Sequence, residues 1–374
     1  MKVLYPFVGD SVGGSHISTI ELYLEMKKKG HNPVIVLHYP NGQLSDYLQK
    51  KGIPYLNIET KYLPLANGKL INIIKSLLWN YRNFSVFLKL NRIDIIHCND
   101  IRMNILWSLI SKLNKTSFIW HQRQLFTSSK RWKLLPRLAD SVIAISHFVK
   151  ESAPNYLNSN LINVIYNPFT YIFYNKEDAR NLIRREYDIH YKAKILAYVG
   201  RIEEWKQPHI LIRQYAKFIS SKEFDNSKLL IVGTGKKEFI NEVKKIVLEF
   251  GIQDNVIFTG FQNKPDRIIA GSDAIICPSN NEPFGRVLIE SMLQKTIVIA
   301  NNSGCHREII KDSINGYLID INNQKDFSNR LKGIFIEPLK TQKIITKAHN
   351  YARKNYSAKL HFDRVFEVYC EAIK

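Results

Sequence analysis

Cysteine is scarce in this chain of 374 residues. The four cysteines (Cys98, Cys277, Cys305 and Cys370) lie far apart, and no two of them are spaced as C-x-x-C. A scaffold held by disulfides and a zinc site built from thiolates are therefore not expected. A chain of this length buries enough apolar surface to fold without such links. The scarcity also fits a reducing compartment.

The sequence has no long hydrophobic run. Met1 leads into a short apolar stretch and a glycine-rich turn, without the apolar core of about 7–15 residues that a secretory signal has. The longest uncharged candidate for a membrane-spanning segment is Ser152 to Asn175, which contains six Asn and two Pro. A spanning helix needs about 20 mostly apolar residues. We therefore expect a cytoplasmic protein that lies at most on the inner surface of the membrane.

Acidic residues are also in short supply. There are 33 of them against 54 basic residues, which gives a net charge of +21. Such an excess calls for a polyanionic partner: nucleic acid, anionic lipid or a phosphorylated small molecule. Residues 60–93 contain six basic residues and residues 101–139 contain eight, and neither stretch contains an acidic one.

Aromatic and apolar residues are interleaved with these charges, for example Trp79 and the run Lys130-Arg131-Trp132-Lys133. Aromatic and apolar side chains insert at a bilayer interface while cations face its head groups. We therefore expect an anionic membrane surface as a partner. The alternative is an ordinary solvated basic face.

Short β-branched runs alternate with longer helical patterns along the whole chain, which is typical of parallel sheets with helical crossovers. Runs such as Pro33–His38 and Lys194–Val199 are almost continuously apolar, as expected for strands covered on both faces. The pattern restarts after Asn167-Pro168. The sequence therefore predicts an α/β fold of two Rossmann-like domains, residues 1–170 and 171–350. A C-terminal helix in residues 351–374 is expected to pack back on the first domain.

Ligands of such sheets bind beyond the carboxyl ends of the strands, so we expect the site in a cleft between the two domains.

The most informative stretch is D-A-I-I-C-P-S-N-N-E-P-F-G-R-V-L-I-E, residues 273–290. It predicts a buried strand, a turn and a helix whose first turn contains Pro283. Glu282 would then lie at the helix start and Glu290 about 12 Å further along. Two such carboxylates could bind a sugar ring and a ribose. With 18 Glu in the chain, this spacing occurs about once by chance, so the signal lies in the surrounding residues.

This stretch resembles the donor-site signature of retaining GT-B glycosyltransferases of family 4 (group 1 type). The resemblance implies that Glu282 contacts hydroxyls of the donor sugar and that Glu290 contacts the ribose of the nucleotide. It also implies that backbone amides around Phe284 and Gly285 touch the sugar. Members of the family more often have Gly at the position of Pro283, which is a mild departure.

A second element, Gly200-Arg201 with Lys206 five residues on, resembles the strand–G-R-x4-K element of the same family. The resemblance implies that Arg201 and Lys206 hold the donor diphosphate. The chemistry requires cations there, because negative charge grows on the leaving group. Gly233 and Gly235 also follow a strand, and we interpret them as structural.

Three features of the first half match family elements. Gly13 and Gly14 stand between a strand and a helix, where glycine lets the backbone approach a phosphate closely. The resemblance places them at the donor phosphates; the alternative is an ordinary tight turn. His121 ends a strand, and the resemblance implies an active-site histidine near the donor sugar. His97 and Asp100 end the preceding strand and are possible lining residues of the cleft.

The resemblance covers nearly the whole chain and is most specific over residues 194–320. It implies a retaining, metal-independent glycosyltransferase without a cofactor, acting on a UDP- or GDP-linked sugar. The acceptor would be a hydroxyl of a glycan or lipid-linked saccharide in bacterial surface polysaccharide or lipopolysaccharide biosynthesis. Two alternatives remain: a sugar-nucleotide epimerase or phosphorylase of the same fold, and a basic nucleic-acid-binding protein. No nucleic acid is expected as a partner, because neither a helix-turn-helix nor an RNA-binding aromatic signature is present.

Overall fold

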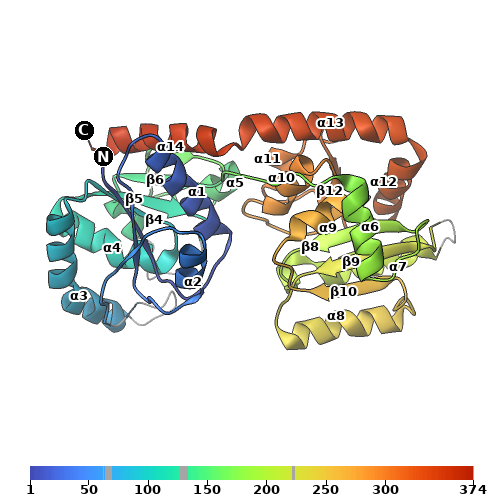
Figure 1. The fold of residues 1–374 in the computed structure, drawn as a ribbon, viewed down its shortest axis with the longest axis horizontal. Helices are drawn as coiled ribbons and strands as arrows, with labels where there is room; N and C mark the ends of the chain where they lie inside the picture. Colours follow the sequence, from blue (N-terminus) through green and yellow to red (C-terminus); the bar gives the residue numbers. More distant parts are fainter. Residues whose placement is uncertain (62, 64–69, 127–133, 221–223, 374) are drawn as a thin grey trace. The chain divides into compact units, whose positions relative to one another are not determined.

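The chain divides into two units in this computed structural model, which describes residues 1–374 except 62, 64–69, 127–133, 221–223 and 374 (Figure 1). Unit 1 consists of residues 1–170 and 356–374, and unit 2 of residues 171–355. The sequence placed the second boundary at residue 350. Unit 2 runs on to Asn355 because the helix α13 (Pro338–Asn355) packs against α10 (Arg286–Leu293) and α12 (Gln324–Ile336) of that unit.

Unit 1 is built on a parallel sheet of seven strands in the order β3-β2-β1-β4-β5-β6-β7. The strands are β1 (Val3–Phe7), β2 (Val34–Leu37), β3 (Leu56–Asn57), β4 (Ile95–Cys98), β5 (Ser117–Gln122), β6 (Ser141–Ala144) and β7 (Ile162–Val164). The helices are α1 (Gly14–Lys28), α2 (Gln43–Lys50), α3 (Leu70–Asn91), α4 (Ile101–Asn114), α5 (His147–Glu151) and α14 (Ala358–Ala372), with short 3-10 turns η1 (Leu135–Leu138) and η2 (Ser159–Leu161).

The central strands of unit 1 are buried on both faces, as their apolar runs predicted. Every residue of β1 and β4 is buried, including the polar His97. The C-terminal helix α14 packs beside α1, and Figure 1 shows the two helices next to each other. Phe362, Val365 and Tyr369 of α14 join the same apolar cluster as Tyr5 of β1. The end of the chain is therefore part of the core of unit 1.

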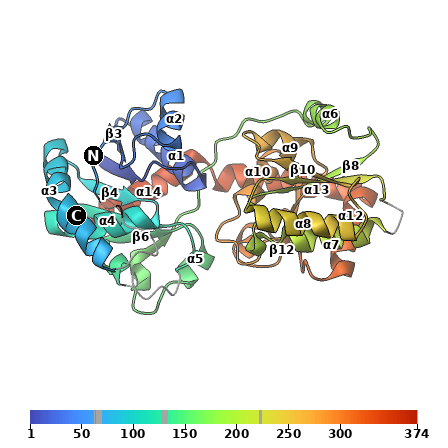
Figure 2. The same cartoon turned by 90° about the horizontal axis from the view of Figure 1, so that it is seen from below.

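Helix α3 packs against α4 at the side of unit 1 (Figure 2). Its inner face carries the buried Phe84 and Leu88, whereas Leu78 and Leu90 on its outer face are 74% and 79% exposed. Among the described residues, no helix combines the length and the apolar content needed to cross a lipid bilayer.

Unit 2 is built on a parallel sheet of six strands in the order β10-β9-β8-β11-β12-β13. The strands are β8 (Lys194–Val199), β9 (Ser227–Val232), β10 (Val256–Gly260), β11 (Ala274–Cys277), β12 (Ile297–Asn301) and β13 (Tyr317–Ile319). Besides α10, α12 and α13, the helices are α6 (Lys176–Glu186), α7 (Pro208–Ile219), α8 (Lys237–Glu249), α9 (Pro265–Gly271) and α11 (His306–Ile309), with a 3-10 turn η3 (Glu204–Lys206).

Two glycines of unit 2 let the loops after β8 and β9 touch backbone to backbone. A Cβ on Gly233 would lie 1.9 Å from the carbonyl oxygen of Gly200, and a Cβ on Gly235 would lie 1.9 Å from that of Ile202. The amide of Gly200 donates to Val232 O at 2.9 Å and that of Ile202 to Thr234 O at 2.8 Å. The structural interpretation of Gly233 and Gly235 is therefore confirmed.

Helix α10 begins later than the sequence predicted. Gly285 has φ of 77°, a left-handed conformation that caps the helix, and the first helical residue is Arg286. The prediction of a helix whose first turn contains Pro283 was therefore wrong. A left-handed residue cannot continue a right-handed helix, so residues 280–284 form a turn instead. Glu290 consequently lies about one turn inside α10.

Candidate active site

Both sheets have a switch point at which neighbouring strands send their following loops in opposite directions. In unit 1 it lies between β1 and β4, and in unit 2 between β8 and β11. Such points open a crevice at the carboxyl ends of the strands, where open α/β sheets bind ligands. The residues predicted to be functional lie near the carboxyl end of these four strands or of their neighbour β5, or in the segments that follow them.

The clearest feature of unit 2 is an ion pair across its switch point. The Lys206 ammonium, in the loop after β8, contacts the carboxylate of Glu282, in the loop after β11. The two side chains are 17% and 10% exposed. The ammonium also lies 4.4 Å from the centre of the Trp205 ring. A largely desolvated cation and carboxylate thus face each other where a ligand would bind.

The backbone around Glu282 is held in place by the loop after β12. Cys305 N donates to Glu282 O at 2.9 Å, and the Ser303 hydroxyl accepts from Asn281 N at 3.1 Å. Gly304, with φ of 56°, lies so close that a Cβ would be 2.6 Å from Glu282 N. This contact fixes the position of Glu282 independently of its side chain.

Glu290 lies one turn after the start of α10 and pairs with Arg286 at 3.2 Å. Burial raises the pKa of the Glu290 carboxyl, and the Arg286 guanidinium acts in the opposite direction. Lys206 also interacts electrostatically with both Glu290 and Cys277. Lys206, Glu282 and Glu290 therefore belong to one charged cluster.

Arg201 differs from Lys206 in its surroundings. Its side chain is 69% exposed and pairs with Glu203 at 2.8 Å. Phe284 is buried next to the left-handed Gly285. The structure thus brings Lys206 and Glu282 together but gives Arg201 a different partner.

Sequence reasoning missed two members of this cluster. Arg286 could have been found, because an Arg–Glu pair four residues apart inside the signature stretch indicates a helical ion pair. His306 is buried, and its Cδ2 would lie 3.3 Å from a Cβ on Gly285. Its Nδ1–H donates to Asn301 O at 2.9 Å, which leaves Nε2 as an acceptor. Burial lowers the pKa of His306.

In unit 1, Gly13 is the N-cap of α1 and Gly14 is the first residue of this helix, directly after the loop that follows β1. Gly13 is extended, with φ of −149°, and a Cβ there would meet His16 Nδ1 at an ordinary 3.8 Å. No side chain caps the helix at Gly13, whose own amide donates to His16 Nδ1 at 3.1 Å. Neither the backbone conformation nor a neighbouring atom requires a glycine at position 13. Because Gly13 has no side chain, it leaves the backbone at the helix N-terminus uncovered.

His97 and His121 are the second-to-last residues of β4 and β5, and they contact each other. His97 Nε2 lies 2.9 Å from His121 Nδ1, and both rings are buried. Burial lowers the pKa of each well below its usual value, and the nearby Arg123 guanidinium adds to the effect. Asp100 caps α4 by accepting from Met103 N at 3.0 Å, and burial raises its pKa to about 6. Asp100 therefore has a structural task whatever else it does.

Arg123 is a residue of this cluster that sequence reasoning missed. Its guanidinium donates to Asn99 Oδ1 at 2.6 Å, to Asn167 Oδ1 and to Thr19 Oγ1. It also lies 3.5 Å from His121 Nδ1. The available signal was its position two residues after His121, directly beyond the end of β5.

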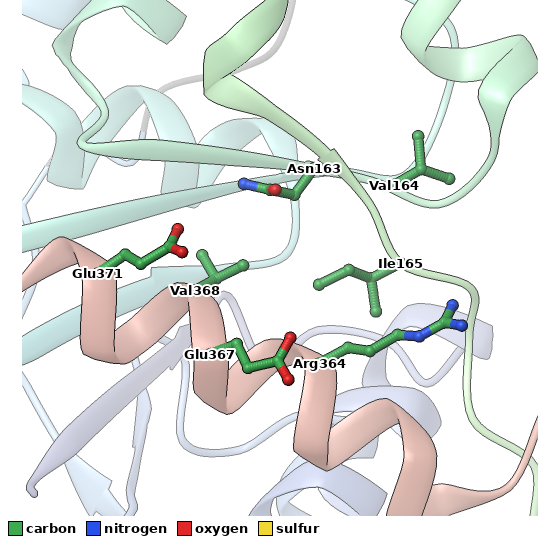
Figure 3. A pocket seen from close by; sticks show the side chains of 7 residues that line it. All are labelled: Asn163, Val164, Ile165, Arg364, Glu367, Val368 and Glu371. Atoms are coloured by element: carbon green, nitrogen blue, oxygen red, sulfur yellow. The ribbon is translucent and has the colours of Figure 1, made fainter.

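Within the described parts of the chain, no three His, Cys, Asp or Glu side chains gather as they would around a metal ion. A pocket of about 230 Å³ lies elsewhere in unit 1, between β7 and α14 (Figure 3). None of the predicted site residues lines it. Its lining residues are Asn163, Val164, Ile165, Arg364, Glu367, Val368 and Glu371.

Comparison with known proteins identifies the class. The sequence matches the family described as "Glycosyl transferases group 1" over residues 179–352 and "Glycosyltransferase Family 4" over residues 12–170. The chain belongs to this family of glycosyltransferases. Anabaena Alr3699/HepE, solved in complex with UDP and glucose, has a TM-score of 0.81 at 20% identity and covers 98% of this chain and 99% of its own. The fold is GT-B, and the predicted family and fold are confirmed.

Two curated relatives match part of the chain. Spore coat protein SA of Bacillus subtilis (strain 168) is 30% identical over 199 residues, which is 51% of this chain and 52% of that protein. The N-acetylgalactosamine-N,N'-diacetylbacillosaminyl-diphospho-undecaprenol 4-alpha-N-acetylgalactosaminyltransferase of Campylobacter jejuni is 30% identical over 164 residues, 43% of each chain. The chain thus spans about half the length of these curated relatives.

We predict that Gly304→Ala displaces the turn that carries Glu282. The new Cβ clashes with the Glu282 backbone and stands at a positive φ, which should lower the free energy of unfolding by about 1–3 kcal/mol. Chemical denaturation measures this change. The matched control is Gly333→Ala inside α12, where a Cβ meets nothing within 4 Å. It should stabilise the protein by about 0.5–1 kcal/mol. Equal effects of the two substitutions would contradict the assigned contact.

Proposed function

We propose that this protein transfers a sugar from a nucleoside diphosphate donor to a hydroxyl of a saccharide acceptor, with retention of the anomeric configuration. The nucleotide that we propose first is UDP. The observation that carries the proposal is the buried Lys206–Glu282 pair beside Glu290 at the switch point of unit 2. The family supports it, as does the UDP and glucose bound to the neighbouring Anabaena structure.

The two carboxylates would hold the hydroxyls of the donor. Glu282 would accept hydrogen bonds from the sugar, with its backbone fixed by Gly304. Glu290, held by Arg286, would accept from the ribose. Hydrogen bonds from hydroxyls to carboxylates are among the stronger ones, so each contact would contribute to donor selection.

The diphosphate would be bound by Lys206 and Arg201. Lys206 already lies in a dry environment, where a cation stabilises growing negative charge more strongly than in water. Arg201 would exchange Glu203 for a phosphate oxygen, which its exposed side chain permits. These two cations would do without a metal ion what a divalent metal does for a leaving diphosphate in other enzymes.

Retention follows if the acceptor attacks from the side of the leaving group, with a donor phosphate oxygen taking its proton. The chain would then need no nucleophile of its own. Gly13 and Gly14 at the donor phosphates, and His121 near the sugar with His97 and Asp100 behind it, remain predictions for unit 1. The acceptor would be a glycan or a lipid-linked saccharide, as the name of the Campylobacter relative suggests for that protein.

The test is transfer itself. Thermal-shift screening of UDP, GDP and their sugars identifies the donor, since a ligand at about 100 times its dissociation constant stabilises by about 2.7 kcal/mol. With that donor and a lipid-linked saccharide, NMR of the product should show a retained anomeric configuration, and EDTA should leave the rate unchanged. Lys206→Ala should abolish transfer while the protein stays folded. An inverted product, or full activity of Lys206→Ala, would refute the proposal.

Glu290→Gln tests the proposed contact with the ribose. Losing the ribose contact should weaken UDP binding by about 10–100-fold, measured by calorimetry. Glu249→Gln on α8, whose carboxylate lies 3.9 Å from Lys245 on the surface, should leave UDP affinity unchanged. Equal affinities of the two variants would remove the assigned role of Glu290.

We also propose that α3 docks the protein on an anionic membrane, at the cytoplasmic face where a lipid-linked acceptor would be reached. Its exposed face joins the cations Lys75, Arg82 and Lys89 with the apolar Leu78 and Leu90. Trp79 also lies on α3, and the Lys61 ammonium is 5.5 Å from the centre of its ring. Exposed aliphatic side chains among cations suit lipid better than nucleic acid. The run Lys130-Arg131-Trp132-Lys133 lies outside the described residues.

The docking proposal predicts a charge-specific loss of vesicle binding. Each cation near an anionic surface contributes about 1 kcal/mol, so the triple change Lys75→Gln, Arg82→Gln and Lys89→Gln should weaken binding about a hundredfold. Co-sedimentation with phosphatidylglycerol-containing vesicles measures it. The control replaces Lys237, Lys244 and Lys245 of α8 by Gln, which removes the same charge. Wild-type binding that does not distinguish anionic from neutral vesicles, or equal losses in both variants, would refute docking through α3.

A further inference from the structure

A row of four buried polar side chains runs through unit 1 from β1 to the end of β5. Tyr5 Oη lies 2.9 Å from Tyr369 Oη, Tyr369 Oη lies 2.5 Å from His97 Nδ1, and His97 Nε2 lies 2.9 Å from His121 Nδ1. All four side chains are 0–1% exposed. The last atom of the row, His121 Nε2, is buried and has no hydrogen-bond partner among the described residues.

These hydrogen bonds can run in only two directions along the row, because each neutral imidazole carries one N–H. If His121 donated from Nδ1, His97 would donate from Nδ1 to Tyr369, and Tyr369 would donate to Tyr5. The Tyr5 hydroxyl hydrogen would then have no acceptor among its partners in the described structure, which is costly in a buried group. In the opposite direction Tyr5 donates to Tyr369 and Tyr369 to His97, so both hydroxyls are satisfied and the hydrogen without an acceptor among the described residues is the one on His121 Nε2. Each direction thus leaves one buried hydrogen unpaired, and the choice between them depends on the surroundings of His121.

Arg123 decides for the second direction. Its guanidinium nitrogen lies 3.5 Å from His121 Nδ1. A guanidinium is a donor at every nitrogen, so it opposes a hydrogen on Nδ1 and favours a lone pair there. With His97 Nε2–H donating to the same Nδ1, the hydrogen of His121 is left on Nε2.

We infer that Tyr369 and His97 act as positioning residues that hold His121 in the Nε2–H tautomer, so that His121 offers a neutral hydrogen-bond donor to a substrate oxygen. The inference rests on the proposed function in one respect, namely that His121 contacts the substrate. A histidine with its hydrogen on Nε2 cannot take a proton at that nitrogen. His121 would therefore stabilise a substrate oxygen and would not act as a general base.

The C-terminal helix α14 carries two residues next to His121. Tyr369 is carried by α14, which packs beside α1 and contacts β5. The same helix carries His361, whose ring stacks near that of His121 with centroids 6.5 Å apart. His361 Nδ1–H donates to Tyr166 O at 2.7 Å, so its Nε2 is an acceptor. Two neighbouring histidines thus carry opposite tautomers, each fixed by its own partner.

Nitrogen NMR of the intact protein labelled with 15N-histidine tests the assignment without any substrate. His121, identified by the loss of its signals in His121→Gln, should show a protonated Nε2 and an unprotonated Nδ1. His361, identified through His361→Gln, should show the reverse and serves as the internal comparison. A protonated Nδ1 on His121 overturns the inference. This readout stands whether or not the protein transfers sugar, so its failure is distinguishable from a failure of the proposed function.

Tyr369→Phe tests the positioning role. Removing the hydroxyl takes away the donor to His97 Nδ1, so the His121 signals should shift toward a mixture of tautomers and kcat should fall about tenfold with KM for the donor unchanged. Tyr215→Phe is the matched control, because it also removes a buried hydroxyl, one that donates to Ser227 O at 2.8 Å in unit 2. It should lower stability without changing kcat. Equal kcat losses in both variants, or an unchanged His121 tautomer in Tyr369→Phe, overturn the role of Tyr369.

Discussion

The ion pair between Lys206 and Glu282 joins the two loops that leave the second sheet on either side of its switch point. Both side chains are mostly buried, so either charge alone would be costly there. The Trp205 ring against the ammonium reduces that cost. The ammonium and the carboxylate can each still form hydrogen bonds with a third group. A diphosphate that carries a sugar fits this description, because its phosphates would approach the cation and its hydroxyls the carboxylate.

Backbone contacts hold the charged groups in place in unit 2, and a buried polar network does so in unit 1. Gly233 against Gly200 fixes the loop that leads to Lys206, and Gly304 fixes the turn of Glu282. In unit 1, the positions of His97 and His121 depend on α14, whose residues come from the far end of the sequence. Both arrangements hold the chemical groups at or beyond the carboxyl ends of strands, where these supporting contacts keep their geometry precise.

Much of this was predictable from the sequence, and the limits have physical causes. The apolar runs predicted the strands. The signature stretch led to Glu282 and Glu290, and the element Gly200-Arg201 led to Lys206, because the spacing within each element is local. The start of α10 at Arg286 was missed, because Pro283 suggested a first turn whereas the left-handed Gly285 decides the cap. The row from Tyr5 to His121 was also missed, since its members are far apart in the chain and meet through tertiary packing.

The central claim is that Lys206 and Glu282 act on the donor as a unit. A double-mutant cycle with Lys206→Met and Glu282→Gln, read by calorimetric binding of the UDP-sugar and of UDP alone, measures this directly. The account predicts a coupling free energy of about 1.5 kcal/mol or more for the UDP-sugar and a smaller one for UDP, which has no sugar for Glu282 to hold. Additive effects of the two substitutions on both ligands would contradict it.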